Sequence, residues 1–452
     1  MKRDAYMVIF VSLLLTTCLG SWNKVFAQEN KQFAYLVLTQ DFQVSLRIVN
    51  EANPTAPAQI HRLETPSGWF PSGQALLSPN GEWLMLLFNS ADQTQWFIQL
   101  VNVATGETRE VAEGLVTGVR FGGLDQSIVW SPNSQYLAYI LDSLDDRHEA
   151  NDLDAYIYAI ADDSQINITH DDLNQYRVAW SSDSTTVVSS AESCPQRDTN
   201  CMVTFDTFDA GTGNRLKSFR TSDLRVGSGT IEVCGLDLSP NKRYMSFISP
   251  CSGIPETPTD VYIWDTETEA ISQITDIFSS GEIPLYMSYN VIWSDNDNLL
   301  IEGTYQLQAE NHNQILNYNV ISNETSILSI DERTIWTVNP NSGDLLVYSS
   351  PIVEDANQIQ IATYSSNGED TLIPLSLETS EASFNISLGC QVYWSPDGQT
   401  IAYTLSQTGD CGARIEKVTF VDITSGSIQE HDVALDNLEG VIYTLPLGWV
   451  AR

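Results

Sequence analysis

The chain has 452 residues, of which 21 are Lys or Arg and 58 are Asp or Glu, so its formal net charge is −37. This excess of negative charge argues against nucleic-acid partners and anionic lipid surfaces, both of which bind basic patches. A hydrophobic fraction of 42% with 11 Trp and 18 Tyr excludes an intrinsically disordered chain. We therefore expect a folded, acidic protein.

The first 27 residues have the pattern of a secretory signal. Lys2 and Arg3 give a positively charged start, residues 8–15 form a short apolar run, and Ala27 offers a small-residue cleavage site. These are the parts of a cleavable export signal, and the apolar run is too short for a membrane-spanning helix. We expect cleavage near Ala27 and a single secreted or periplasmic domain over residues 28–452.

An alternative processing site lies at Cys18, because residues 15–18 weakly resemble a lipoprotein cleavage site. Thr17 directly before the cysteine matches that pattern poorly, so signal cleavage is the favoured prediction. No later apolar run approaches the roughly 20 residues that a spanning helix needs, so we predict no membrane insertion.

A strand–turn–strand pattern recurs along the chain. Its clearest copy is residues 392–405, where Ser-Pro-Asp-Gly at 395–398 suits a type I turn between aromatic and β-branched flanks. The steps between successive copies are 53, 50, 58, 55, 45 and 56 residues. A period near 50 built from short strands is typical of a β-propeller. The copies are centred on Ser78, Ser131, Ser181, Ser239, Ser294, Asn339 and Ser395.

Each repeat offers two further strands after the hairpin. An alternating strand follows it, as at residues 97–101, 155–159, 261–264 and 417–421, then a polar turn and a short outer strand. Four antiparallel strands make one propeller blade, and stacked blades bury one another's apolar faces. Tryptophans at one position of the repeat are expected to pack between neighbouring blades as core, without a ligand role. They are Trp130, Trp180, Trp293, Trp336, Trp394 and Trp449.

The two ends of the chain complement each other. Residues 33–38 resemble the second strand of a repeat and residues 42–49 the third, whereas residues 441–450 resemble a first strand, with Trp449 in the place of Trp394. We therefore predict that the last residues supply the inner strand of the first blade and so close the ring. This makes eight blades. Seven is the alternative, if the divergent copy near residue 336 or the N-terminal segment forms no full blade.

Six cysteines remain after the signal, in three close pairs. Six cysteines allow 15 connectivities, but each pair flanks or spans a short connection, and Cys234 and Cys251 flank a hairpin almost symmetrically. Pairing of neighbours in an oxidising compartment is therefore favoured. A metal site is disfavoured because CxxC spacing and nearby His are lacking. The predicted disulfides join Cys194 to Cys201, Cys234 to Cys251 and Cys390 to Cys411.

The repeat at 394–403, Trp-Ser-Pro-Asp-Gly followed by Ile-Ala-Tyr, resembles that of TolB-like propellers. It is also similar to the N-terminal propeller of dipeptidyl peptidases and prolyl oligopeptidases. The resemblance covers nearly all of the mature chain, and it implies an exported binding or assembly platform. In those peptidases the propeller gates a separate hydrolase domain, which we do not expect here. Fold alone does not define function.

One acid-rich segment, residues 142–154, is longer than its counterparts between the second and third strands of other repeats. Clustered carboxylates are the ligands that Ca²⁺ prefers, although the spacing differs from the DxDxDG loop, and a solvated loop is the alternative interpretation. The candidate ligands are Asp142, Asp145, Asp146, Glu149, Asp152 and Asp154. No other cofactor is predicted.

No GxSxG, P-loop or HExxH motif is present, and the five His are isolated and expected at the surface. The favoured hypothesis is a non-enzymatic exported propeller that binds a protein, peptide or glycan through the loops at one end of its ring. The alternative is a propeller hydrolase or lyase whose carboxylates meet near the central channel. The sequence carries no signature of oligomeric state.

Overall fold

The computed structural model describes residues 31–450 with several internal gaps. Within the described ranges the regular secondary structure consists of strands alone. None of the described segments forms a helix of the length and apolarity that crossing a bilayer requires. The ranges left out are 116–126, 143–152, 171–172, 194–201, 222–232, 250–259, 276–286, 308–309, 330–332, 340–344, 350–359, 365–369, 374–391, 407–414 and 434–440.

The strands are short, as the period-two patterns predict. Their bounds are β1 Gln32–Thr39, β2 Val44–Asn50, β3 Gln59–Leu63, β4 Trp69–Leu77, β5 Trp83–Ser90, β6 Gln95–Asn102, β7 Thr108–Leu115, β8 Ile128–Trp130, β9 Tyr136–Asp142, β10 Leu153–Ala159, β11 Ser164–Asn167, β12 Gln175–Trp180, β13 Thr186–Ser193, β14 Met202–Asp209, β15 Arg215–Thr221, β16 Cys234–Leu238, β17 Tyr244–Ser249, β18 Asp260–Asp265, β19 Ile271–Gln273, β20 Met287–Trp293, β21 Asn298–Leu307, β22 Glu310–Asn319, β23 Glu324–Ser329, β24 Arg333–Val338, β25 Leu345–Ser349, β26 Gln360–Tyr364, β27 Asp370–Ile373, β28 Tyr393–Trp394, β29 Thr400–Ser406, β30 Ile415–Asp422, β31 Ile428–Asp432 and β32 Val441–Val450.

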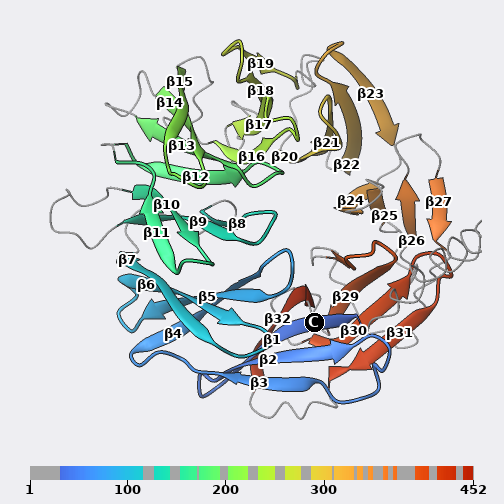
Figure 1. The fold of residues 1–452 in the computed structure, drawn as a ribbon. Helices are drawn as coiled ribbons and strands as arrows, with labels where there is room; N and C mark the ends of the chain where they lie inside the picture. The colour runs from blue at the N-terminus through green and yellow to red at the C-terminus, as the bar shows by residue number, and fades with distance from the viewer. Residues whose placement is uncertain are drawn as a thin grey trace, which may run out of the picture.

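These strands form six four-stranded antiparallel sheets and one eight-stranded sheet. In five of the four-stranded sheets the strands follow chain order, as in β12-β13-β14-β15. Figure 1 shows the sheets one after another around a common centre, with β12, β16, β20 and β24 toward the middle and β15, β19, β23 and β27 outside. This is the arrangement of a β-propeller, as the repeat period predicts.

Each predicted hairpin forms the first two strands of a sheet. In the turn between β8 and β9, the Ser131 hydroxyl donates to Asn133 Oδ1 and accepts the Tyr136 backbone N–H at 2.9 Å. The residue after Asn133 is Ser134, which adopts a φ of 61°. Asn and Asp side chains support such turns because they mimic backbone acceptors. The divergent copy behaves in the same way, since β24 and β25 pair and continue into β26 and β27.

The first sheet contains both ends of the described chain, in the order β3-β2-β1-β32. Phe33 in β1 lies opposite Trp449 in β32, so the pairing predicted for the last residues is confirmed. The Phe33 ring contacts Trp449 and Phe420 edge-on, with centroids 5.9 and 6.1 Å away. The C-terminal strand is therefore anchored in the hydrophobic core as well as by backbone hydrogen bonds.

The eight-stranded sheet consists of two four-stranded halves that touch at one residue pair. Leu115 at the end of β7 pairs with Asp142 at the end of β9. Gly114 allows this contact, because a Cβ at that position would lie 1.9 Å from the Leu141 side chain and 2.8 Å from the Asp142 carbonyl. A close backbone approach of this kind is one of the few places where glycine is required.

The hydrophobic core lies between the faces of neighbouring sheets. Phe205 of β14 packs on Phe247 of β17 with ring centroids 5.0 Å apart, and on Trp264 of β18 at 5.8 Å. All three side chains are completely buried. Alternating aromatic and β-branched residues on adjacent strands thus bury one another, which is the main stabilising contribution in such a fold.

Four of the repeated tryptophans join neighbouring four-stranded units through the same hydrogen bond, when the two halves of the eight-stranded sheet are counted as separate units. The indole N–H donates to the backbone carbonyl of the residue that precedes the corresponding position in the previous sheet. This geometry confirms the predicted place of these side chains between sheets. The pairs are Trp130 to Leu76 at 3.1 Å, Trp180 to Val129 at 3.2 Å, Trp293 to Asp237 at 3.3 Å and Trp449 to Tyr393 at 3.0 Å. Trp394 is buried, and the side chain of Trp336 lies outside the described part of the structure.

Two sequence expectations are wrong in detail. The strand predicted from Phe42 begins at Val44, because Phe42 lies in the preceding turn with a φ of 60°. His431, expected at the surface, is fully buried in β31, and its Nδ1 lies 2.7 Å from the Pro54 carbonyl of the first sheet. This hydrogen bond compensates for the burial, since a buried imidazole needs a hydrogen-bond partner.

Candidate functional site

The antiparallel order of the strands divides the connections between two ends of the molecule. First-to-second and third-to-fourth strand connections lie at one end, which we call the turn end. Second-to-third and sheet-to-sheet connections lie at the opposite end, which we call the loop end. Connections at the turn end span 4 residues (294–297) to 8 residues (51–58), whereas those at the loop end span 2 residues (308–309) to 19 residues (374–392).

The turn end is held by hydrogen bonds between successive four-stranded units, with the two halves of the eight-stranded sheet counted separately. The backbone N–H of Asn80 donates to the Ser134 hydroxyl at 2.9 Å, and that of Asn133 donates to the Ser184 hydroxyl at 2.9 Å. The amide of Asn339 donates to the Gly398 carbonyl at 3.0 Å. The recurring turn residues of the motif thus join neighbouring four-stranded units, which leaves them unsuited to recognising a ligand.

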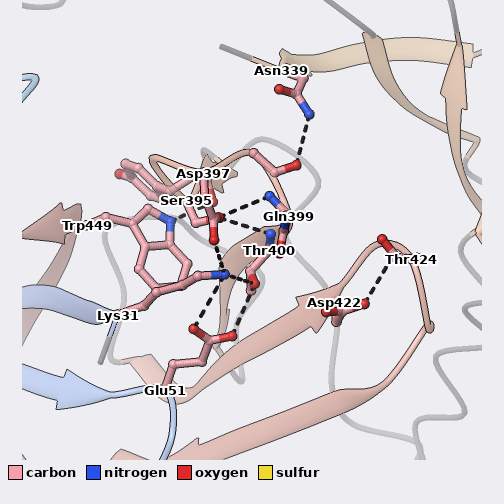
Figure 2. A network of polar contacts seen from close by, with 12 residues as sticks. Lys31, Glu51, Asn339, Ser395, Asp397, Gln399, Thr400, Asp422, Thr424 and Trp449 are labelled. Carbon is pink, nitrogen blue, oxygen red and sulfur yellow. Dashed lines mark hydrogen bonds and ion pairs between the residues drawn. The ribbon is translucent and has the colours of Figure 1, made fainter. Parts of the chain in front are cut away.

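The N-terminal part of the described chain meets the last sheet in a polar seam, which comprises Lys31, Glu51, Asp397 and Thr400 (Figure 2). The Lys31 ammonium lies 2.9 Å from Asp397 Oδ2 and 3.9 Å from Glu51 Oε2, and it donates to Thr400 Oγ1 at 2.8 Å. The Thr400 hydroxyl donates to Glu51 Oε1 at 3.1 Å. One cation therefore joins the N-terminal strands to the hairpin near residue 395.

The charges of the seam serve that structural role. Although partial burial opposes ionisation, the Ser395 hydroxyl and the Lys31 ammonium hold the pKa of Asp397 below its usual range. Burial raises the pKa of Glu51, and Lys31 counteracts this effect. Figure 2 shows the Lys31 ammonium in contact with Asp397, Glu51 and Thr400, all within the protein. We assign the seam to stability and look for a binding site at the loop end.

The calcium hypothesis is only partly covered by the described residues. Asp154 is buried, and its two carboxylate oxygens accept hydrogen bonds from Asn167 at 2.7 Å and Thr169 at 3.1 Å. Asp260 and Thr275 form the same contact at 3.2 Å in another sheet, so Asp154 belongs to a repeated structural pair. Asp142 is buried at the end of β9. Asp145, Asp146, Glu149 and Asp152 lie outside the described residues.

Across the described ranges, no three His, Cys, Asp or Glu side chains come close enough together to hold a metal ion. The disulfide hypothesis stays a prediction as well. Cys234 begins β16 opposite Ile248 of β17, which confirms the hairpin around it. Cys234 forms no disulfide with another described residue. Cys194, Cys201, Cys251, Cys390 and Cys411 lie outside the described residues.

One inner-strand carboxyl group has an unusual environment. Burial raises the pKa of Asp237 in β16 to about 6, and backbone N–H groups of Trp293 and Leu238 counteract that rise. Asp237 thus faces the next sheet, where its carbonyl also accepts the Trp293 indole N–H. A carboxyl group with a pKa near neutrality can exchange protons with a substrate, provided that a substrate reaches it.

The loop end carries an apolar surface that sequence analysis missed. Phe42 in the turn between β1 and β2 is 48% exposed, and Phe70 at the start of β4 is 38% exposed. Their rings contact edge-to-face with centroids 5.3 Å apart. The available signal was a large apolar residue in a turn, but residue 42 was assigned to the following strand. Exposed aromatic pairs are typical of interaction surfaces.

Solved structures similar to this chain include propeller proteins, at TM-scores below 0.5. No protein-family model and no curated protein sequence matches it. Dipeptidyl peptidase 4 of Porphyromonas gingivalis is similar at 13% identity and a TM-score of 0.48, over 79% of this chain and 52% of that one. This chain therefore spans about half the length of that peptidase.

Two further similar structures cover most of their own chains. The β-propeller domain of the Trilobed protease from Pyrococcus furiosus has 15% identity and a TM-score of 0.45, over 79% of this chain and 97% of that one. Oligogalacturonate lyase from Vibrio parahaemolyticus has 11% identity and a TM-score of 0.47, over 83% and 94%. The fold assignment rests on the sheets described above, and no activity is transferred from these proteins.

Proposed function

We propose that this chain is an exported, non-enzymatic eight-bladed β-propeller that binds a protein, peptide or glycan through its loop end. The observation that supports this proposal most is the contrast between the two ends. Turn-end residues are engaged in contacts between sheets, whereas loop-end connections differ widely in length and carry exposed aromatic side chains. Variable loops on a rigid scaffold are the usual place for binding groups.

The blade count is part of the proposal. Six four-stranded sheets and the two halves of the eight-stranded sheet give eight units. The pairing of β1 with β32 and the polar seam support a ring whose first blade is completed by the last strand. Such closure leaves no exposed sheet edge at the junction, which favours a stable extracellular scaffold.

The test is saturable binding that maps to one end. The mature chain, residues 28–452, is immobilised and incubated with the native exoproteome, and any partner is purified and titrated. Hydrogen exchange of the complex is then compared with that of the free protein. We expect protection at residues 64–68 and 91–94, and none at 266–270 and 423–427. The proposal fails if no partner saturates or if protection maps to the turn end.

A hydrolase or lyase is the second candidate, and Asp237 is the observation that favours it. Its raised pKa suits a general acid, although a single carboxyl group is one half of the pair that such reactions use. A screen of peptide and glycan substrates with the wild-type protein and the Asp237→Asn variant tests it. Turnover that the variant loses by at least a hundredfold would favour the enzyme over the platform.

A further inference from the structure

The loop end of the first two sheets combines three features that point to a binding partner. The first is the pair of exposed rings, Phe42 and Phe70, which come from neighbouring sheets and contact each other. The second is a small apolar cavity whose lining includes Val44 and Pro71, which lie close to these rings in the sequence. The third is the negative charge of the surrounding connections. We call the two rings and the cavity together the aromatic rim.

Phe42 occupies a backbone conformation that side chains of its kind rarely adopt. Its φ is 60°, in the left-handed region where a bulky residue costs about 1–2 kcal/mol. The equivalent turn of the next sheet has Gln93 at this position, with a φ of 58°. Both turns close in the same way, since Phe42 N–H donates to the Thr39 carbonyl at 2.9 Å and Gln93 N–H to the Ser90 carbonyl at 3.0 Å. A phenylalanine is thus not needed for the turn to form.

The cavity is formed where β4 bulges away from its neighbour. The register of β4 on β5 shifts between Pro71 and Ala75, and Gly73 takes a φ of 82° within the bulge. The Ser72 hydroxyl fixes the bulge by donating to the Leu87 carbonyl at 2.8 Å. The cavity has a volume of about 30 Å³. Its lining includes Leu38, Val44, Pro71, Gln74, Tyr443 and Leu445.

The volume and lining limit what the cavity can accept. Sites for small molecules measure at least about 300 Å³, so 30 Å³ suits only the tip of one apolar side chain. A glycan would need several polar groups for its hydroxyls, and the lining offers chiefly aliphatic carbon. β-Bulges beside binding sites commonly re-aim the strand in this way.

The charge of the connections around the two rings distinguishes between the possible macromolecular partners. The three nearby connections, residues 40–43, 64–68 and 91–94, contain Asp41, Glu64 and Asp92 and no Lys or Arg. The whole chain carries a net charge of −37, so a second copy is repelled at this face. A positively charged segment is attracted, and cations also bind favourably on the faces of aromatic rings.

We propose that the aromatic rim binds an extended basic peptide segment of a partner protein, with one apolar side chain in the cavity and flanking Lys or Arg side chains near Phe42, Phe70 and the acidic connections. This inference rests on the proposed binding function and names the partner class and the subsite. Anchoring by one apolar side chain with basic flanks gives specificity from the cavity and rapid association from the charges.

Three fluorescein-labelled synthetic nonapeptides test the inference by anisotropy titration. The first has a central Leu flanked by Lys and Arg, the second has Ser in place of Leu, and the third has Glu in place of every basic residue. We expect wild-type protein to bind the Leu peptide at least tenfold more tightly than the Ser peptide, and to bind the acidic peptide undetectably. Equal affinity for the Leu and Ser peptides would overturn the cavity's role.

Two variants locate the binding. Phe42→Gln installs the residue that the equivalent turn already uses, so the fold is kept, and we expect at least tenfold weaker binding of the Leu peptide. Ile321→Gln removes a 60% exposed apolar side chain from the turn end and is the matched control, with unchanged binding expected. Undiminished binding by Phe42→Gln, with an unchanged Tm, would overturn the proposal.

The same variants separate this inference from the proposed function. If a saturable exoproteome partner binds Phe42→Gln as tightly as wild type, the platform stands and the aromatic rim is not its subsite. The molar mass in solution distinguishes a second copy from the basic segment. If wild type has twice the monomer mass and Phe42→Gln has the monomer mass, the occupant is a second copy and the basic segment is refuted.

Discussion

The turn end and the loop end of this molecule are built from the same strands but use their connecting residues differently. At the turn end, Ser, Asn and Asp side chains satisfy backbone groups of their own turn and of the preceding four-stranded unit. At the loop end, the turn around Phe42 satisfies its own backbone and leaves the aromatic ring exposed. Substitutions should therefore affect stability at one end and binding at the other.

The largest effect is expected from removing the strand that joins the two chain ends. Deletion of residues 441–452 removes β32 and the Trp449 contacts with Phe33 and Tyr393. We expect a loss of more than about 5 kcal/mol, comparable with the whole stability of a typical domain. Thermal unfolding and protease resistance measure it. Replacing residues 40–43 with the sequence of 91–94 is the loop-end control, and an unaffected deletion variant would refute the shared first sheet.

A single tryptophan between sheets comes next. Trp180 is 7% exposed, stacks on Tyr136 at 5.8 Å and donates to the Val129 carbonyl. Truncation to Ala should cost about 3–5 kcal/mol in urea unfolding. Trp180→Phe keeps most of the packing and loses the hydrogen bond. Its free energy of unfolding should fall by about 1 kcal/mol more than the smaller ring alone explains. A Trp180→Phe variant as stable as wild type would contradict a role for the indole N–H.

The turn-end serines should matter more than loop-end serines. Ser131→Ala leaves the Tyr136 N–H without its acceptor, and we expect a loss of about 2 kcal/mol in urea unfolding. Ser67→Ala, in the exposed connection 64–68, should change stability by less than about 0.5 kcal/mol. Similar losses at both positions would remove the distinction between the ends.

The free energy of unfolding should depend on pH through Asp237. Its folded pKa is raised to about 6 from 3.8, so the fold favours the protonated form. The resulting stabilisation is complete below about pH 4 and is lost as pH rises through 6. Relative to Asp237→Asn, wild type should lose on the order of 1–2 kcal/mol between pH 4 and 7, because water partly screens this half-buried site. A flat difference across that range would contradict the raised pKa.

The smallest effect on stability is expected at Phe42. Phe42→Gln should leave the free energy of unfolding within about 0.5 kcal/mol of wild type, because Gln93 occupies the equivalent turn. Phe42→Gly should stabilise the fold by up to about 1 kcal/mol through relief of the left-handed strain. A loss above about 1 kcal/mol for either variant would mean that the ring supports the turn itself, and differential scanning calorimetry decides.

The sequence predicted the sheets well because each hairpin is a local event. Ser-x-Asn and Ser-x-Asp turns, β-branched flanks and a tryptophan at a fixed position carry their information within about 15 residues. Trp449 allowed the same inference for the last strand. The seam could not be predicted, because Lys31 and Asp397 meet across the fold and nothing in either segment identifies the other as its partner.

The candidate site was less accessible from sequence. Abundant acids drew attention to residues 142–154, yet Asp154 belongs to a repeated structural pair with Thr169. The aromatic rim was missed because Phe42 was assigned by its apolar character to a strand, whereas the hydrogen bonds of Thr39 place it in a turn. Exposure is a property of tertiary structure, so residue type alone could not reveal it.

The placement of β1 between β2 and β32 has a consequence for biogenesis. During synthesis, β1 can pair with β2 at once, but its other edge remains open until more than 400 further residues have emerged. That edge includes Phe33 and Tyr35, both fully buried in the finished protein. The nascent chain therefore exposes an unpaired apolar strand edge for nearly the whole of its translation. Chaperones in the compartment where it folds are expected to bind such an edge.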